Sequence, residues 1–314
     1  MFMLENQITI GSRNVLEEYL DGFDYRTSGL TFTSMYMWRN INFFSWQIIG
    51  DYLCISGISH LELDKKRPFL FPPLTKTGEY DPSKLRETIL EAKKIFEDRG
   101  HEFNIRLLPF HMIEIIEAAF PGELRFIEDR PNYDYVYLAK DLIELAGRKY
   151  HPKRNHLNYF RENYDYKYIR LTSSMAEDAM KFIREFNLRK LPLSDYEMDL
   201  LRMEELAMED VLYNLERVGY LTGAIIIDDA IQALCIGGPL GRNTIAVHVE
   251  KANIEYRGAY QAINNEFCKH EASNIKYINR EEDMGIPGLR KAKLSYRPVK
   301  LIETHIAFFS RRSD

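Results

Sequence analysis

Ionisable side chains gather in one short stretch near the C-terminal end of the sequence. Asn279, Arg280 and Glu281 follow one another at the predicted end of a strand, and Asp283 lies two residues further on. A guanidinium binds a carboxylate or phosphate through two parallel hydrogen bonds, whereas a carboxylate binds an amine. We therefore expect Arg280 to hold an anionic group, and Glu281 or Asp283 to hold a substrate amine. The alternative is a solvated face of mixed charge.

A second pair of ionisable residues lies on a predicted strand over residues 244–250. Strict alternation along a strand places His248 and Glu250 on one face and the valines and isoleucine on the other. Two such groups on one face could transfer a proton. A polar row that faces solvent is the alternative.

A third stretch follows that strand and opens a helix. Arg257 directly precedes Gly258, Ala259 and Tyr260. The first backbone N–H groups of a helix have no partner within the helix and attract anions, and a glycine lets a ligand approach the backbone closely. The pattern fits a donor that carries phosphate groups. A glycine turn with a surface arginine fits it as well.

Basic residues gather once more, in the middle of the chain. Lys149, Lys153 and Arg154, together with Arg148, lie just before and within a predicted helix. Such a run indicates either a contact with the phosphate backbone of a nucleic acid or a nonspecific surface patch. No closely spaced His and Cys set is present, so no metal site is expected.

Capping and turn residues predict the elements that must position these groups. Asp81 before Pro82 opens a helix that ends near Gly100, and Gly50-Asp51 is typical of a hairpin turn. Ser174 and Ser194 each begin a capping-box pattern, which predicts two further helices. Later segments predict strands at about 219–227, 231–237, 244–250 and 276–279, a helix at about 260–272, and a last strand at 301–309.

The order helix, strand meander, helix, strand, helix, strand occurs in both halves, so we expect an α+β fold with two lobes. The predicted boundaries are an N-terminal lobe at 1–147, a linker helix at 148–165, and a C-terminal lobe at 166–314 that carries the site. The length of 314 residues is large for one hydrophobic core and suits two.

Composition limits the class of protein. The net charge of −5 argues against a dedicated nucleic-acid binder, so any RNA contact must come from a local basic patch. Three widely spaced cysteines favour buried free thiols and a reducing compartment. The sequence shows neither a signal-peptide pattern at Met1 nor an apolar stretch long enough for a transmembrane helix, so we expect a cytoplasmic protein.

Three of these stretches also carry a resemblance to a known family. Residues 279–296 resemble the signature of uncharacterised bacterial proteins grouped with the phosphatidylglycerol lysyltransferase C-terminal domain. Residues 149–156 resemble the linker of that family, and residues 256–261 resemble its donor loop. The family is similar to the Fem peptidyltransferases and is built from two tandem GNAT (acyl-CoA N-acyltransferase) folds.

The resemblance implies transfer of an acyl or aminoacyl group from acyl-CoA or aminoacyl-tRNA to an amine or hydroxyl, with no covalently bound cofactor. The acceptor would be a small molecule, a lipid or a peptide. On this hypothesis Glu250 or His248 is the base and Tyr296 the acid on the leaving group. The remaining roles are donor binding by Arg257 to Tyr260, acceptor binding by Asn279 to Glu281, and tRNA binding by the linker cations, Lys149, Lys153 and Arg154 among them.

Two other functions remain open at this point. One is a binding module that keeps the fold without the reaction, and the other is a plain CoA-dependent N-acetyltransferase.

Overall fold

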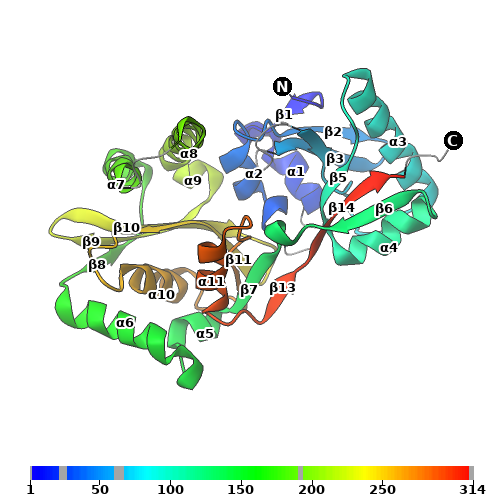
Figure 1. Cartoon of the computed structure of the whole chain (residues 1–314). Coiled ribbons are helices and arrows are strands. Elements are labelled where there is room, and N and C mark those ends of the chain that lie inside the picture. Colours follow the sequence, from blue (N-terminus) through cyan, green and yellow to red (C-terminus); the bar gives the residue numbers. More distant parts are fainter. Residues whose placement is uncertain (1, 21–26, 60–66, 190–193, 311–314) are drawn as a thin grey trace. The chain divides into compact units, whose positions relative to one another are not determined.

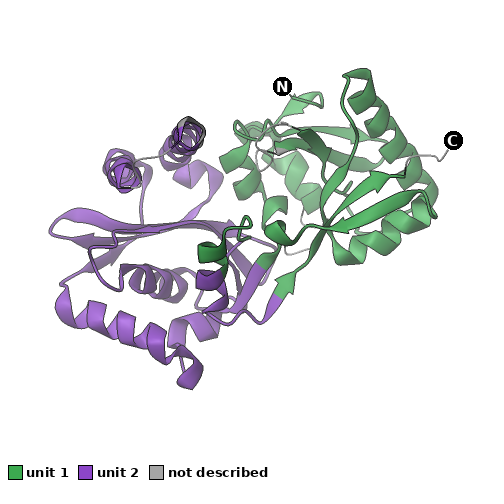
Figure 2. Cartoon of the chain, in the orientation of Figure 1, with its two compact units in different colours: residues 1–134, 282–290, 301–314 green, residues 135–281, 291–300 purple. Residues whose placement is uncertain are grey.

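Two mixed β-sheets form in the residues that the computed structural model describes, which are 2–20, 27–59, 67–189 and 194–310 (Figure 1). Each sheet belongs to one of two compact units (Figure 2). Unit 1 consists of residues 1–134, 282–290 and 301–314, and unit 2 consists of residues 135–281 and 291–300. Helices accompany both sheets, which confirms the α+β class.

The sheet of unit 1 has the strand order β1-β2-β3-β4-β5-β14-β6 in the described residues. Its strands are β1 (Asn6–Gln7), β2 (Ser45–Ile49), β3 (Tyr52–Ser59), β4 (Arg67–Leu70), β5 (Ile105–Pro109), β6 (Leu124–Glu128) and β14 (Thr304–Phe309). The helices are α1 (Arg13–Leu20), α2 (Phe32–Trp38), α3 (Pro82–Asp98) and α4 (Phe110–Ala119), with short 3₁₀ turns at Ile10–Ser12, Ser28–Leu30 and Arg130–Asn132.

The sheet of unit 2 has the order β13-β7-β12-β11-β10-β9-β8. Its strands are β7 (Asp134–Leu138), β8 (Lys167–Ile169), β9 (Leu221–Ile227), β10 (Ala230–Pro239), β11 (Thr244–Ala252), β12 (Tyr277–Asn279) and β13 (Lys300–Ile302). The helices are α5 (Ala139–Glu144), α6 (His151–Asn163), α7 (Ala176–Leu188), α8 (Asp195–Tyr213), α9 (Leu215–Val218) and α10 (Ala259–Glu271), with 3₁₀ turns at Arg148–Tyr150 and Ser173–Met175. In α11 (Pro287–Leu294), residues 287–290 belong to unit 1 and residues 291–294 to unit 2.

The units do not coincide with the predicted lobes. β7 follows β6 in the chain but pairs with β12 in the sheet of unit 2, and β14 follows β13 but pairs with β5 and β6 in the sheet of unit 1. Each half of the sequence therefore gives one strand to the other unit. Periodicity shows that a segment is a strand, but its pairing partner depends on contacts between distant segments.

The predicted linker helix forms as α6 and belongs entirely to unit 2. Leu157 and Phe160 on its buried face are covered, and the helix packs against α10. In Figure 1, α6 and α10 lie on one face of the sheet of unit 2 and α7 and α8 lie on the other. Helices on both faces explain why most residues of β10 and nearly all residues of β11 are buried.

Local sequence signals explain most of the element boundaries. Asp81 accepts hydrogen bonds from the backbone N–H groups of Ser83 and Lys84 at the start of α3. Ser194 and Glu197 form the predicted capping box of α8. The capping box predicted at Ser174 is wrong, because α7 begins at Ala176 after a 3₁₀ turn and no side chain caps it.

Candidate active site

The parallel strands β11 and β12 separate inside unit 2. They pair only from Thr244 with Tyr277 to Ala246 with Asn279, whereas β11 continues to Ala252. Beyond Ala246, the described residues provide no strand partner for this edge of β11. The strand ends that follow the separation carry the residues singled out in the sequence, so the gap brings them together.

A buried ion pair bridges the gap. The Arg280 Nη2 atom donates to the Glu250 Oε1 atom at 2.7 Å, and the Asn264 side chain on α10 donates to Glu250 Oε2 at 2.9 Å. Burial is the largest single effect on Arg280 and disfavours its charged form, but Glu250 together with Tyr137 and Tyr296 more than offsets it, so the pKa of the guanidinium is raised. Because both Glu250 oxygens are held, this carboxylate fixes the orientation of Arg280.

A second pair, His248 and Glu281, lies beside the first. The His248 Nδ1 atom is 2.7 Å from the Glu281 Oε1 atom, and the His248 side chain is fully buried. Glu281 has a left-handed backbone with φ of +57°, and its N–H donates to the Asn279 side chain at 2.8 Å. This conformation costs about 1 kcal/mol in a non-glycine residue, so its neighbours must hold Glu281 in place.

The alternation of side chains along β11 does not predict the partners of His248 and Glu250. Ile236 on β10 pairs with Val249, and Gly237 pairs with Val247, so His248 is the extra residue of a β-bulge. A bulge redirects the side chains around it and is frequent next to active sites. His248 and Glu250 accordingly have different partners, although the sequence predicts one shared face.

Tyr296 and Lys153 complete the cluster. The ring of Tyr296 is buried, and its centroid lies 4.8 Å from the Arg280 guanidinium carbon and 4.1 Å from the Lys153 ammonium nitrogen. Burial raises the pKa of the Tyr296 hydroxyl, and Arg280 opposes this effect. Burial and the nearby Arg280 charge lower the pKa of Lys153 to about 8, against a smaller opposing effect of Glu250.

The predicted donor loop lies at the N-terminus of α10, which Gly258 caps. Gly258 has φ of +95°, and a Cβ atom there would lie 2.3 Å from the carbonyl oxygen of His156 on α6. The glycine therefore allows α6 and α10 to pack closely, in addition to any role toward a ligand. Arg257 is exposed and its guanidinium lies 4.4 Å from the centroid of the Tyr159 ring.

Two further residues of this loop point inward. Ala259 is buried in the first turn of α10. Burial raises the pKa of Tyr260, while a backbone hydrogen bond from Ala252 opposes the shift. The Tyr260 hydroxyl thus satisfies the last backbone N–H of β11, at the far end of the gap.

The structure separates the three basic residues predicted to contact a nucleic acid. Lys149 forms an ion pair of 3.0 Å with Asp141, and Arg154 donates to the backbone carbonyls of Leu145 and Gly147 after α5. Lys153 instead extends toward Tyr296. Lys149 therefore contacts the first turn of α5, and Arg154 contacts the C-terminal end, where carbonyl groups lack partners within the helix.

Asp283 is a correction to the sequence analysis, which expected this residue or Glu281 to hold a substrate amine. Its carboxylate is fully buried in unit 1 and accepts two hydrogen bonds from Arg290, one from Arg130 and one from the backbone of Gly285. A carboxylate with these partners has no capacity left for a substrate amine. It fixes the loop before α11.

Lys293, near the end of the same helix, is buried and donates to the backbone carbonyl of Arg280. This contact holds the backbone of a residue in the cluster. One cationic side chain of α11 therefore faces the protein interior.

Sequence reasoning missed Asn264 and the inward position of Lys153. Asn264 lies on the buried face of α10, and a polar residue at a buried helical position is the signal that was available. The position of Lys153 gave no comparable signal. It depends on the packing of α6 against α10, which brings this side chain next to Tyr296.

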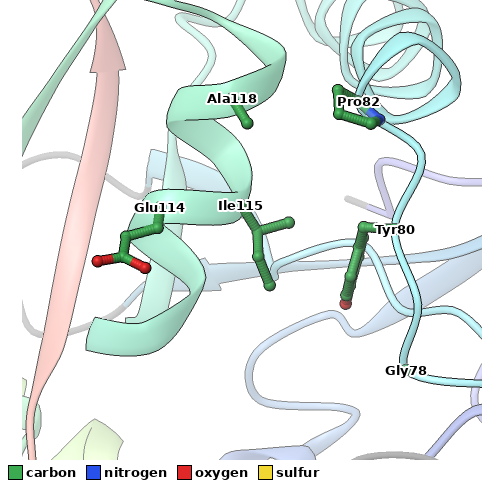
Figure 3. A pocket seen from close by; sticks show the side chains of 6 residues that line it. All are labelled: Gly78, Tyr80, Pro82, Glu114, Ile115 and Ala118. Carbon is green, nitrogen blue, oxygen red and sulfur yellow. The ribbon is translucent and has the colours of Figure 1, made fainter.

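Unit 1 has a hollow of its own, of about 330 Å³ (Figure 3), which is lined by Gly78, Tyr80, Pro82, Glu114, Ile115 and Ala118. Figure 3 shows Ile115 and Ala118 facing Tyr80 and Pro82, whereas the carboxylate of Glu114 turns away. The hollow contains none of the predicted site residues. Its mainly apolar lining gives no reason to place a reaction there.

In the described residues, no group of three or more His, Cys, Asp or Glu side chains is arranged to hold a metal ion. No helix within these residues has the length and apolar character needed to cross a bilayer.

The sequence and fold were then compared with those of known proteins. A family model described as phosphatidylglycerol lysyltransferase, C-terminal, matches residues 21–308. A conserved protein of unknown function from Bacteroides thetaiotaomicron is 31% identical, with a TM-score of 0.84 over 97% of this chain and 99% of that one. An uncharacterised protein of Mycoplasmoides gallisepticum is 28% identical over 180 residues, and the match spans 55% of each chain, about half of the relative's length.

More distant solved structures share the fold. L-PGS from Bacillus licheniformis is 13% identical, with a TM-score of 0.64 over 99% of this chain and 95% of that one. FemX is 10% identical, with a TM-score of 0.52 over 98% of both chains. A tandem GNAT protein from the clavulanic acid pathway is 11% identical, with a TM-score of 0.50 over 98% of this chain and 96% of that one. These likenesses confirm the predicted tandem GNAT-like fold.

Proposed function

Because the chain belongs to the phosphatidylglycerol lysyltransferase C-terminal family, we propose that it transfers an acyl or aminoacyl group in the gap between β11 and β12. The donor in this proposal carries phosphate groups, as acyl-CoA and aminoacyl-tRNA do, and the acceptor is an amine or a hydroxyl. The observation that carries the proposal is the ion pair of Arg280 and Glu250, buried where the two parallel strands separate.

Such a transfer needs positioning and charge stabilisation more than a covalent nucleophile. The acceptor attacks the carbonyl carbon of the donor, and the developing oxyanion requires hydrogen-bond donors that are already in place. The Arg280 guanidinium meets this requirement, because Glu250, which Asn264 holds in turn, fixes it and it need not reorganise during the reaction. We therefore assign Arg280 to the reacting end of the substrates.

A base must remove a proton from the attacking group. Both oxygens of Glu250 already accept hydrogen bonds, which makes His248 the better candidate. When Nδ1 of a neutral histidine donates to a carboxylate, as His248 can to Glu281, the other ring nitrogen carries no proton and can accept one. The raised pKa of Tyr296 keeps its hydroxyl protonated at neutral pH, so this residue can serve as the acid on the leaving group.

The donor phosphates are assigned to the N-terminus of α10. Arg257 is exposed there, and α10 continues for 13 residues, so its first turn carries a partial positive charge. Asn279 and Glu281 lie across the gap and are assigned to the acceptor. We assign no tRNA contact to Lys149 or Arg154, because both are engaged with α5 and its C-terminal end.

Titration of the purified protein with CoA, acetyl-CoA and aminoacylated tRNA tests the proposal. A donor at 100 times its dissociation constant stabilises the protein by ~2.7 kcal/mol, which a thermal shift detects. Product analysis after adding an amine then separates an enzyme from a binding module. Stabilisation by a donor without any product would favour the binding module, and no stabilisation by any donor would contradict the proposal.

A further inference from the structure

Two cationic groups in the cluster have N–H donors that no described residue accepts. Arg280 uses Nη2 for Glu250, but its buried Nη1 atom has no hydrogen-bond acceptor among the described residues. Lys153 contacts the ring of Tyr296, and the described residues give its ammonium no hydrogen bond or ion pair. A buried donor without an acceptor is rare in folded proteins and requires an explanation.

The charges around Tyr296 do not balance. Arg280 and Lys153 bring two positive charges, and Glu250 brings one negative charge. Glu281 contacts His248 and is not among the charges that act on Lys153 or Tyr296. One uncompensated positive charge therefore remains beside a buried aromatic ring, where the desolvation of ions is costly. A single oxyanion would supply both the missing charge and the missing acceptor.

Arg280 and Lys153 also differ in their exposure to solvent. The guanidinium is fixed by Glu250 on β11 and lies almost entirely out of reach of solvent. Lys153 reaches the cluster from α6, is only half-buried and has a flexible side chain, so an anion would enter on its side. The fixed guanidinium would set the position of the anion, and the mobile ammonium would close over it.

We propose that Lys153 and Arg280 form an oxyanion-binding subsite over the ring of Tyr296, and that a phosphate or carboxylate group of a substrate occupies it. This subsite lies apart from the α10 N-terminus, where Arg257 is assigned to donor phosphates. Its assignment to a substrate rests on the proposed transferase function. The binding of an anion does not depend on that function.

The intact protein titrated with inorganic phosphate and, separately, with acetate at constant ionic strength tests the subsite. We expect at least one of the two anions to bind, and Lys153→Met to raise its Kd tenfold or more. Lys140→Met is the matched control, because Lys140 lies on the surface of the same unit with 78% of its side chain exposed. This control should leave the Kd unchanged.

The two anions distinguish the sources of the ligand group. Tighter binding of phosphate would identify a phosphate group, and tighter binding of acetate would identify a carboxylate; both support the subsite. The proposal is overturned if neither anion binds, or if Lys153→Met binds as well as the unmodified protein. Since Lys153 is half-buried and unpaired, Lys153→Met should fold, and Lys153→Gln provides a second variant with the same expectation.

The subsite and the proposed function can fail separately. Anion binding that depends on Lys153, in a protein that transfers no acyl or aminoacyl group, would contradict the function and leave the subsite standing. Transfer that Lys153→Met does not impair, with an unchanged Kd for the anion, would contradict the subsite and leave the function standing.

Discussion

Replacing Lys153 with methionine should stabilise the protein at neutral pH. The lysine is half-buried next to Arg280, and the described residues give its ammonium no ion pair. Methionine keeps an unbranched chain of similar length that can cover the ring of Tyr296. The substitution thus removes a repelled charge and retains most of the apolar contact.

The size of this stabilisation follows from the lowered pKa of Lys153. A fall from 10.5 to about 8 would correspond to roughly 3 kcal/mol if Lys153 were fully buried. Solvent screens a group that is partly exposed, so we expect about 1 kcal/mol for Lys153→Met at pH 7.

The lowered pKa of Lys153 also determines how the stability difference between the two proteins changes with pH. The folded protein releases the Lys153 proton near pH 8, whereas the unfolded chain keeps it up to about pH 10.5. The unfolded state therefore binds more protons between these values, and the stability contribution of Lys153 rises with pH across this window. The advantage of Lys153→Met should be largest below pH 8 and should be smaller at pH 9.5.

Urea denaturation of both proteins at pH 7.0 and pH 9.5 measures this difference, because other groups titrate alike in the two proteins. A Lys153→Met variant that is less stable than the unmodified protein at pH 7 would contradict a destabilising charge at Lys153. So would a stability difference that is the same at both pH values, since the difference would then come from packing alone.

Three other substitutions should lower the free energy of unfolding, each measured by urea denaturation. Gly258→Ala places a Cβ atom at a left-handed residue against α6 and should cost ~2 kcal/mol or more; a loss below about 0.5 kcal/mol would show that α6 can move aside. Glu250→Gln leaves the buried Arg280 without its carboxylate and should cost ~3 kcal/mol, so a neutral effect would contradict the ion pair. Asp283→Asn breaks a buried carboxylate pair with Arg290 in unit 1 and should also cost ~3 kcal/mol; an effect typical of a surface pair, below ~1 kcal/mol, would contradict its structural role.

The sequence predicted the parts of the site that depend on local pattern. The strand that carries Glu250 and the strand end that carries Arg280 follow from β-favouring residues and turn residues nearby. Asp81 and Ser194 predicted helix starts because a capping side chain bonds to its own helix.

The remaining features depend on contacts between distant segments. β7 and β14 pair with strands of the other half of the chain, and the periodicity of the sequence does not predict such pairing. The bulge at His248 is visible only in the register between β10 and β11. By sequence alone, Lys153 groups with the neighbouring basic residues, because no local pattern predicts that α6 brings it to Tyr296.

The resemblance to the lysyltransferase family supplied the fold that the pattern alone left open. Residue patterns predicted two lobes of α+β structure, and the family match over residues 21–308 confirms the relationship. The family match does not show how the charged groups at the gap are paired. The structure shows which of them form ion pairs and which have no partner among the described residues.

Group transfer in the gap between β11 and β12 is tested most directly by the rate at which acylated product forms from a donor. The intact protein is incubated with acyl-CoA or aminoacylated tRNA and an amine acceptor, alongside a folded Arg280→Gln variant. We expect acylated product from at least one donor, formed at least 100-fold more slowly by the variant. Equal rates for the two proteins, or no product from any donor, would contradict it.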